Sequence, residues 1–355
     1  MSLPRVFAVA ALLGFPCGCQ GDPVGTVPAD DGAADAATEA AFDAGPYKWE
    51  LVYEDPTAGP DDALHAIWGS GGYIVAVGSN ALTVEFDGST WHARNKTNGA
   101  HLYGVWGTSP DDVAAVGQYS FNGTPAIFYK NAGGWIIGGP FPSDMQALTS
   151  VWGVGTQKYF TSLDGRIYQD DPVNKPSQPY HLAVITGGCP IGNPVSPQLN
   201  GIDGTGLDNI MVVGDERLQA HRDGTDGWAT FCALAPEVQF SSVTTIPGST
   251  DFYVGANFHG LYRWLGRTEP MAQIFEDRGF AGADKAYLQG MWAAHSALVV
   301  AVGSGGKVLI YDGTQAGAKT IPAPTTDELY DVWGLNERTL YIVGKGARIW
   351  RLTLP

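Results

Sequence analysis

The hexapeptide LYGVWG at residues 102–107 decides the fold, because variants of it recur along the chain. Seven copies occur: LHAIWG (64–69), LYGVWG (102–107), LTSVWG (148–153), LNGIDG (199–204), FSSVTT (240–245), LQGMWA (288–293) and LYDVWG (329–334). A valine-glycine pair ends ten or eleven residues after the tryptophan position in every copy except the third. Such self-similarity indicates one structural unit that is used seven times.

The spacing of the copies predicts the blades of a propeller. Neighbouring copies begin between 38 residues apart (Leu64 to Leu102) and 51 residues apart (Leu148 to Leu199). Each interval holds about four short apolar segments, and none shows the 3.6-residue period of a helical repeat. The 48 glycines and 23 prolines among 355 residues also favour short strands joined by tight turns. We therefore predict an all-β protein, a seven-bladed β-propeller.

The two ends of the chain predict how the ring closes. After the seventh copy the chain has only two more strand-like segments before Pro355, so the last blade lacks a fourth strand. A segment that aligns with the fourth-strand region around Trp91, Tyr47 to Val52, precedes the first copy instead. We expect this N-terminal strand to complete the seventh blade, which leaves no open edge between blades.

The residues after each leading apolar residue predict what lines the central channel. The second residue after it is small in six copies, as expected where blades converge: Ala66, Gly104, Ser150, Gly201, Ser242 and Gly290. The seventh copy has Asp331, whose charge near the axis must be offset by water, a cation or a hydrogen-bond donor.

Two hypotheses explain Asp331. In one, it accepts hydrogen bonds from backbone amides where the first and seventh blades meet, and so helps to close the ring. In the other, it belongs to a ligand-binding site at one mouth of the channel. That site would comprise Asp331, Tyr330, Tyr103 and His65.

The repeated tryptophans also have two interpretations. They are Trp68, Trp106, Trp152, Trp292 and Trp333. Exposed rings at these positions would be platforms on which sugars stack. A residue repeated at one position of every blade more often packs between blades, and we favour that interpretation.

With these repeats, residues 48–355 resemble the tryptophan-glycine repeat propellers of exported bacterial lipoproteins. The chain is more distantly similar to Asp-box propellers such as sialidases and photosystem II assembly factors. Its Asp-box match is DGSTW at residues 87–91, which lacks one residue between Asp and Gly. In that family the box is a turn that supports the fold, so the resemblance implies a propeller and not an activity. The start motif of sialidases, Arg-Ile-Pro, is not found.

The first residues have the pattern of an export signal. A weakly basic start is followed by an apolar run, Val6 to Phe15, that is too short to span a bilayer. The next residues resemble a bacterial lipobox, with Cys19 after Gly18 as the expected lipidation site and Cys17 as the alternative. Gln20 resembles the residue that sorts lipoproteins to the outer membrane.

These features predict three parts of the chain. Residues 1–18 are a lipoprotein signal peptide, residues 19–46 are a disordered acidic tether of Ala, Asp, Gly and Pro, and residues 47–355 are the propeller. The expected location is the cell envelope, as an outer-membrane lipoprotein or at the cell surface, with the lipid as the only membrane contact.

Two cysteines remain within the predicted propeller. Cys189 and Cys232 lie in the outer parts of the third and fourth blades, and the envelope is oxidising. We predict a disulfide between them, which would hold the proline-rich insertion from Asp170 to Gln198. The alternative is two free buried thiols.

Composition and motifs favour a binding protein over an enzyme. The 36 acidic residues against 20 basic ones oppose binding to nucleic acid. The seven histidines form no HExxH motif, and no catalytic motif occurs in a suitable context. We expect no cofactor; the segment Asp203 to Asp208 has calcium-like spacing, but turn chemistry explains it as well.

The functional hypothesis is a monomeric binding or scaffold protein that recognises a glycan or an envelope protein through loops at the channel face. The alternative is an extracytoplasmic polysaccharide hydrolase or lyase. Two carboxylates about 5 to 10 Å apart beside an acid with a shifted pKa would favour that alternative.

Overall fold

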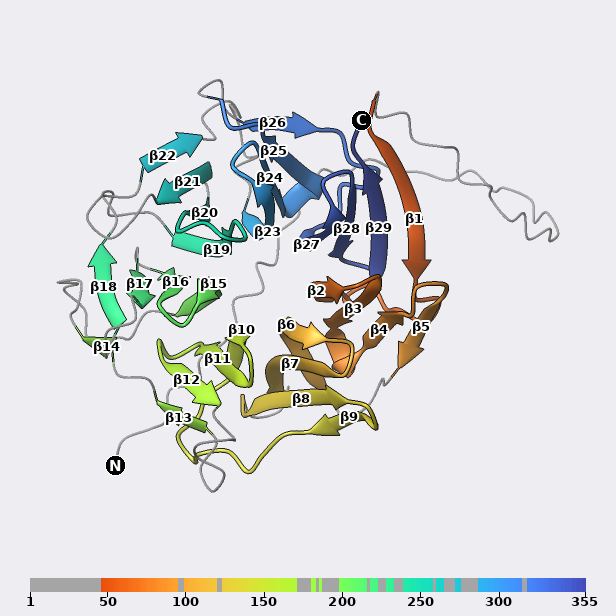
Figure 1. The fold of residues 1–355 in the computed structure, drawn as a ribbon. Helices are drawn as coiled ribbons and strands as arrows, with labels where there is room; N and C mark the ends of the chain where they lie inside the picture. Colours follow the sequence, from red (N-terminus) through yellow and green to blue (C-terminus); the bar gives the residue numbers. More distant parts are fainter. Residues whose placement is uncertain are drawn as a thin grey trace, which may run out of the picture. The chain divides into compact units, whose positions relative to one another are not determined.

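The protein is a seven-bladed β-propeller in a computed structural model (Figure 1). The structure describes residues 46–94, 99–119, 123–170, 180–182, 185–186, 198–215, 218–222, 228–232, 239–257, 260–264, 272–275, 287–314 and 318–355. The predicted signal peptide, the tether up to Gly45, and Cys17 and Cys19 lie outside these residues. No helix within the described ranges is long and apolar enough to cross a membrane.

Blades 1 to 3 are four-stranded antiparallel sheets. From the channel outward, they consist of β2 (Leu64–Ser70), β3 (Tyr73–Gly78), β4 (Thr83–Phe86) and β5 (Trp91–Arg94); β6 (Ala100–Ser109), β7 (Asp112–Tyr119), β8 (Pro125–Asn131) and β9 (Gly134–Ile137); and β10 (Leu148–Val154), β11 (Gln157–Ser162), β12 (Ile167–Asp170) and β13 (Tyr180–Leu182). A 3₁₀ turn, η1 (Ser79–Ala81), joins β3 to β4.

Blades 4 to 7 continue around the ring. They consist of β15 (Leu199–Gly206), β16 (Asn209–Gly214), β17 (Leu218–Arg222), β18 (Trp228–Cys232) and β14 (Ile185–Thr186); β19 (Gln239–Thr245), β20 (Phe252–Asn257), β21 (Gly260–Trp264) and β22 (Ala272–Phe275); β23 (Leu288–His295), β24 (Leu298–Gly303), β25 (Lys307–Tyr311) and β26 (Ala318–Ile321); and β27 (Leu329–Asn336), β28 (Thr339–Gly344), β29 (Arg348–Thr353) and β1 (Lys48–Glu54). The 3₁₀ turn η3 (Ser304–Gly306) precedes β25.

The predicted closure of the ring is confirmed. Strand β1 pairs antiparallel with β29, with Lys48 opposite Thr353 and Glu54 opposite Arg348, and is the outermost strand of the seventh blade (Figure 1). Side chains reinforce the pairing, because Arg348 Nε lies 2.7 Å from Glu54 Oε1 and Trp49 Nε1 donates to the Pro322 carbonyl oxygen at 3.0 Å.

The insertion between the third and fourth blades contributes a strand that the repeat did not predict. Strand β14 runs parallel to β18 at the outer edge of blade 4, with Ile185 opposite Trp228. Cys232 ends β18, whereas Cys189 lies outside the described residues, so the disulfide stays a prediction.

Inter-blade packing explains why tryptophan and glycine recur together. Each tryptophan packs against the glycine of the next blade: Trp68 on Gly107, Trp106 on Gly153, Trp152 on Gly204, Trp292 on Gly334 and Trp333 on Gly69. A Cβ atom on Gly69 would lie 2.7 Å from Trp333 Cη2, closer than such atoms approach in proteins. The pair therefore needs a glycine, and the predicted packing role of the tryptophans is confirmed.

The junctions between blades 4 and 5 and between blades 5 and 6 lack this pair, and each lacks both of its members. Asp203 stands at the tryptophan position of blade 4, and Thr245 stands at the glycine position of blade 5. Thr244 and Ala293 replace the pair between blades 5 and 6. Where the indole ring is absent, the next blade does not need a glycine at the facing position.

Candidate functional site

The seven innermost strands line the channel with more side chains than regular strands could. In every blade the pairing with the second strand shifts register after the leading residue, as between Leu64 and Ala66 in β2 and between Leu329 and Asp331 in β27. Such a bulge interrupts the alternation of side chains between the two faces. The first and second residues after the leading one therefore both reach the channel.

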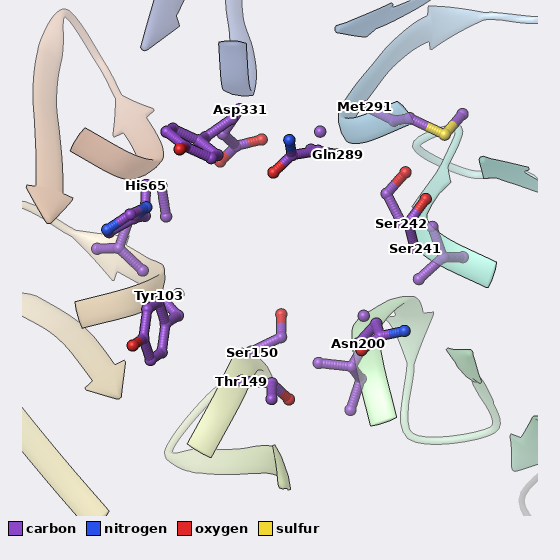
Figure 2. A pocket seen from close by; sticks show the side chains of 18 residues that line it. His65, Tyr103, Thr149, Ser150, Asn200, Ser241, Ser242, Gln289, Met291 and Asp331 are labelled. Atoms are coloured by element: carbon purple, nitrogen blue, oxygen red, sulfur yellow. The ribbon is translucent and has the colours of Figure 1, made fainter. Parts of the chain in front are cut away.

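The first-position residues form a polar ring at one mouth, which we call the polar mouth (Figure 2). They are His65, Tyr103, Thr149, Asn200, Ser241, Gln289 and Tyr330. The His65 ring lies between two tyrosines, with centroids 5.3 Å from Tyr103 and 4.9 Å from Tyr330. The space that they enclose is about 130 Å³.

Hydrogen bonds hold the two tyrosines of the polar mouth. Gln118 Nε2 donates to the Tyr103 hydroxyl at 2.9 Å, and the Tyr330 hydroxyl donates to Glu328 Oε2 at 2.7 Å. Burial, with a smaller contribution from His101, lowers the pKa of His65 to about 4. His65 is therefore neutral at neutral pH and brings no positive charge to this mouth.

Asp331 connects the seventh blade to the first. Its Oδ2 accepts a hydrogen bond from the Ile67 backbone N–H at 2.9 Å, and its Oδ1 accepts one from the Val332 N–H at 2.8 Å. This geometry is the one expected from the ring-closure hypothesis. The carboxyl group also lines the channel, where burial raises its pKa to about 7. The structure thus brings together all four residues of the predicted site; their role in ligand binding stays a prediction.

The opposite end of the channel is a larger cavity of about 570 Å³, which we call the tryptophan mouth. Its wall includes the five repeated tryptophans, Trp68, Trp106, Trp152, Trp292 and Trp333. They belong to the consecutive blades 6, 7, 1, 2 and 3 and form an arc. Trp152 is 6% exposed and the other four are half-buried. None of the five indole N–H groups donates a hydrogen bond to another described residue.

A polar sector completes the tryptophan mouth where blades 4 and 5 lack the ring. Asp203 Oδ2 accepts hydrogen bonds from the Thr245 backbone N–H at 2.7 Å and from Thr245 Oγ1 at 3.3 Å. Its Oδ1 accepts one from the Gly204 N–H at 2.8 Å. Burial raises the pKa of Asp203 to about 6, although these hydrogen bonds act in the opposite direction. Pro247, on the loop after β19, forms part of the rim.

The tryptophan mouth was not predicted as a site. The sequence indicated its tryptophans as packing residues, and Asp203 only as part of a turn with calcium-like spacing. Asp203 occupies the position of the repeated tryptophan in the fourth copy, and this substitution was the sequence feature that could have indicated the site. Within the described ranges no three His, Cys, Asp or Glu side chains are grouped as they would be to hold a metal ion.

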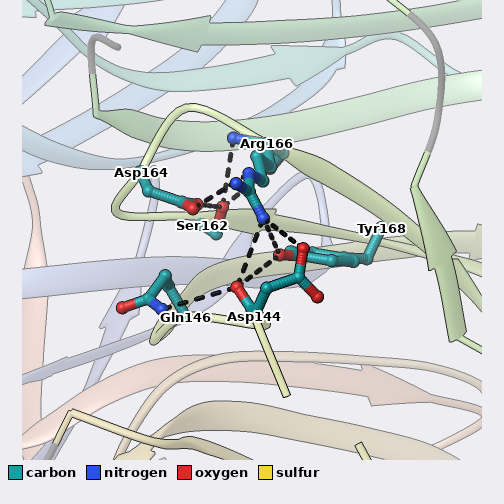
Figure 3. A network of polar contacts seen from close by, with 6 residues as sticks. All are labelled: Asp144, Gln146, Ser162, Asp164, Arg166 and Tyr168. Atoms are coloured by element: carbon teal, nitrogen blue, oxygen red, sulfur yellow. Dashed lines mark hydrogen bonds and ion pairs between the residues drawn. The ribbon is translucent and has the colours of Figure 1, made fainter. Parts of the chain in front are cut away.

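A second polar network surrounds Arg166, between the second and third blades (Figure 3). Its Nη1 lies 2.8 Å from Asp144 Oδ2, and its Nε lies 3.1 Å from Asp164 Oδ2. The Tyr168 hydroxyl lies 3.4 Å from the same Nη1. Two carboxylates thus already contact this guanidinium, so it is poorly placed to bind the carboxylate of a substrate.

The segment at residues 87–91, which the sequence analysis compared with an Asp box, forms a turn. Asp87 Oδ1 accepts hydrogen bonds from the backbone N–H groups of Ser89 and Thr90 at 2.8 and 2.9 Å. A hydrogen bond of 2.6 Å from the Ser89 hydroxyl, together with these two backbone hydrogen bonds, lowers the pKa of Asp87. The residue stabilises the turn before β5, far along the blade from the channel-lining strand β2.

Comparisons with known proteins support the fold. No family model and no curated protein matches the sequence. Among solved structures, a streptogramin B lyase has a TM-score of 0.70 at 12% identity and covers 87% of this chain and 98% of its own. YCF48 from Cyanidioschyzon merolae has a TM-score of 0.65 at 15% identity, covering 86% and 98%. YCF48 bound to D1 peptide has a TM-score of 0.64 at 13% identity, covering 89% and 99%. The class defined is the seven-bladed β-propeller.

Proposed function

We propose that this chain is a binding or scaffold propeller of the bacterial cell envelope that takes a protein partner at the tryptophan mouth. A lipid on Cys19 would anchor it to the outer membrane or the cell surface, and residues 19–46 would hold the propeller away from the membrane. The tryptophan-lined cavity is the observation that carries the proposal.

The sizes of the two mouths favour the tryptophan mouth. Its volume of about 570 Å³ lies within the usual range of roughly 300 to 1,000 Å³ for ligand sites. The polar mouth, at about 130 Å³, offers space for only a few waters or a small ion. The residues predicted from the sequence would then support the ring more than they bind a partner.

The chemistry of the wall favours a protein partner. Tryptophan is enriched where proteins bind proteins, because a large apolar ring carries one polar N–H that a ligand can satisfy. A similar propeller, YCF48, binds a peptide. A glycan that stacks on the indole rings is the alternative ligand.

A library experiment tests this proposal. The whole chain, purified in an uncharged detergent, is screened against phage-displayed random peptides and against a glycan array. Pro247→Trp places a bulky ring at the tryptophan mouth, whereas Gln289→Trp fills the polar mouth and is the matched control. We expect selected peptides to lose binding to the Pro247→Trp variant and to keep binding to the Gln289→Trp variant. The reverse pattern, or glycan binding alone, would contradict the proposal.

One observation favours the second candidate, a polysaccharide hydrolase or lyase. Asp203 and Asp331 line the same cavity, and burial raises the pKa of both carboxyl groups toward neutrality, as a general acid requires. Against it, all four of their oxygens accept hydrogen bonds from backbone amides. Such bonds fix the carboxyl groups in place and occupy the atoms that would transfer a proton.

Only the second candidate function, the polysaccharide hydrolase or lyase, predicts that the protein cleaves a polysaccharide. Incubation of the protein with bacterial polysaccharides, followed by a reducing-end or unsaturated-product assay, should detect no cleavage. Cleavage that the Asp203→Asn substitution abolishes would support the enzyme instead.

A further inference from the structure

The described wall of the tryptophan mouth carries acidic side chains and no basic one. Two carboxyl groups, those of Asp203 and Asp331, line it together with five indole rings, and no Lys, Arg or His is among its described lining residues. We infer that this mouth recognises an organic cation, presented by the protein partner as a lysine or arginine side chain. The inference rests on the proposed function and specifies the chemistry that its partner must carry.

The first argument comes from the indole rings. The face of an aromatic ring is electrostatically negative, tryptophan most strongly, and it attracts ammonium and guanidinium groups. One such contact already exists beside the cavity, where Lys158 Nζ lies 6.0 Å from the centroid of the Trp106 ring. Lys158 does not line the cavity, and it pairs with Asp112 at 2.9 Å. The other rings of the arc contact no cation among the described residues.

The second argument comes from how the two carboxyl groups are held. Both accept hydrogen bonds from neutral donors, the Ile67 and Val332 amides for Asp331 and the Thr245 and Gly204 amides for Asp203. Neutral donors orient a carboxylate without cancelling its charge. A cation in the cavity would supply the missing counter-charge.

Two other acidic side chains of the propeller, by contrast, have cationic partners. Glu85 lies 3.7 Å from Lys130 Nζ and 3.5 Å from Arg94 Nε. Asp251 lies 2.5 Å from Arg263 Nη2. Neither Asp203 nor Asp331 forms an ion pair with any described residue. These two acids line the same cavity.

The size of the cavity favours a cation that is attached to a chain. A volume of about 570 Å³ exceeds what one ammonium group fills, and leaves room for an extended side chain and neighbouring peptide atoms. The net charge of −16 also favours the approach of a basic segment.

Isothermal titration calorimetry on the whole chain in uncharged detergent tests the inference. The probes are N-acetyl-lysine methylamide, its norleucine counterpart, which has no charge, and tetramethylammonium chloride as a free ammonium. We expect the lysine probe to bind at least about fivefold more tightly than the norleucine probe.

Two variants with equal charge changes provide the control. Pro247→Lys places a competing cation at the exposed rim, and we expect it to weaken binding of the lysine probe at least about threefold. Ile137→Lys places the same charge on β9, where Ile137 is 57% exposed, and should leave that affinity unchanged.

Each contrary outcome identifies what has failed. Equal binding of the lysine and norleucine probes, or equal effects of the two variants, would overturn the inference. If tetramethylammonium binds and the lysine probe does not, the mouth recognises a small free ammonium compound and not the side chain of a protein partner. That result would also overturn the inference. If peptides without a basic residue bind at the tryptophan mouth, the inference of a cationic ligand is wrong, but the proposed function is still supported. If the lysine probe binds and no peptide binds at this mouth, the mouth recognises a cation but the proposed binding of a protein partner is wrong.

Discussion

The carboxylate of Asp203 in the fourth blade accepts a hydrogen bond of 2.7 Å from the backbone N–H of Thr245 in the fifth. At the corresponding place between five other pairs of neighbouring blades an indole ring lies on a glycine, as Trp333 lies on Gly69. A polar contact thus replaces an apolar one at the same junction, and both partners differ from the repeat. Asp331 and the Ile67 N–H make a similar contact between blades 7 and 1.

The contact between Asp203 and Thr245 predicts that substitutions at these two positions have coupled effects on stability. Asp203→Trp alone should lower the free energy of unfolding by about 2 to 4 kcal/mol, because the indole would meet the Thr245 side chain. Adding Thr245→Gly restores the pair found elsewhere and should recover at least about 1.5 kcal/mol of that loss. Urea unfolding of the two single variants and the double variant measures the coupling. Strictly additive effects would show that the two positions do not depend on each other.

Asp203 and Asp331, which are partly buried, predict a specific dependence of stability on pH. An unfolded aspartate titrates near pH 4, whereas burial raises the pKa of Asp203 to about 6 and that of Asp331 to about 7. The folded state binds these protons more tightly, so the stability that they contribute is complete below about pH 4 and is lost as the pH rises through 6 and 7.

The Asp331→Ser variant isolates this effect. Between pH 5 and pH 8, we expect the wild type to lose on the order of 2 kcal/mol more stability than the variant, a value reduced because the channel is open to water. Urea unfolding at a series of pH values measures both slopes. Parallel slopes would mean that Asp331 titrates normally.

Ring closure predicts the effect of removing β1. A chain that begins at residue 55 loses the strand paired with β29. The exposed edge should lower stability by more than the roughly 0.5 to 3 kcal/mol of a typical point mutation, or cause self-association. A chain that begins at residue 46 is the control and should behave as the full propeller does. Thermal melting and light scattering distinguish the two; a monomeric chain from residue 55 with unchanged melting would refute the closure mechanism.

The lipid anchor predicts a separation of membrane binding from folding. Cys19→Ala should remove palmitate labelling and membrane association but leave thermal melting of the propeller unchanged, because the anchor is joined through residues 19–46. Labelling that persists in this variant and is lost on Cys17→Ala would move the lipid to Cys17.

The repeat was sufficient to predict seven blades and the closure of the ring. The reason is that tryptophan, glycine and the leading leucine occupy packing positions that recur from blade to blade. Contacts between different copies could not be predicted in the same way. Asp203 and Thr245 are 42 residues apart, and only the alignment of adjacent blades brings them together. The bulge after each leading residue is equally invisible in a pattern of side chains, yet it turns His65 and Tyr103 into the channel. Strand β14 lies in a proline-rich insertion that lacks periodicity.

Indole N–H signals in ¹H–¹⁵N spectra test the binding site most directly, because the chain has 11 tryptophans and only five line the tryptophan mouth. Assignment by single Trp→Phe variants separates the five from the others, such as Trp135 in β9 and Trp264 in β21. On titration with N-acetyl-lysine methylamide, we predict that the signals of several mouth tryptophans shift with one common affinity while those of Trp135 and Trp264 stay fixed. Unchanged mouth signals at saturating probe, or shifts of equal size throughout the eleven, would contradict a binding site at this mouth.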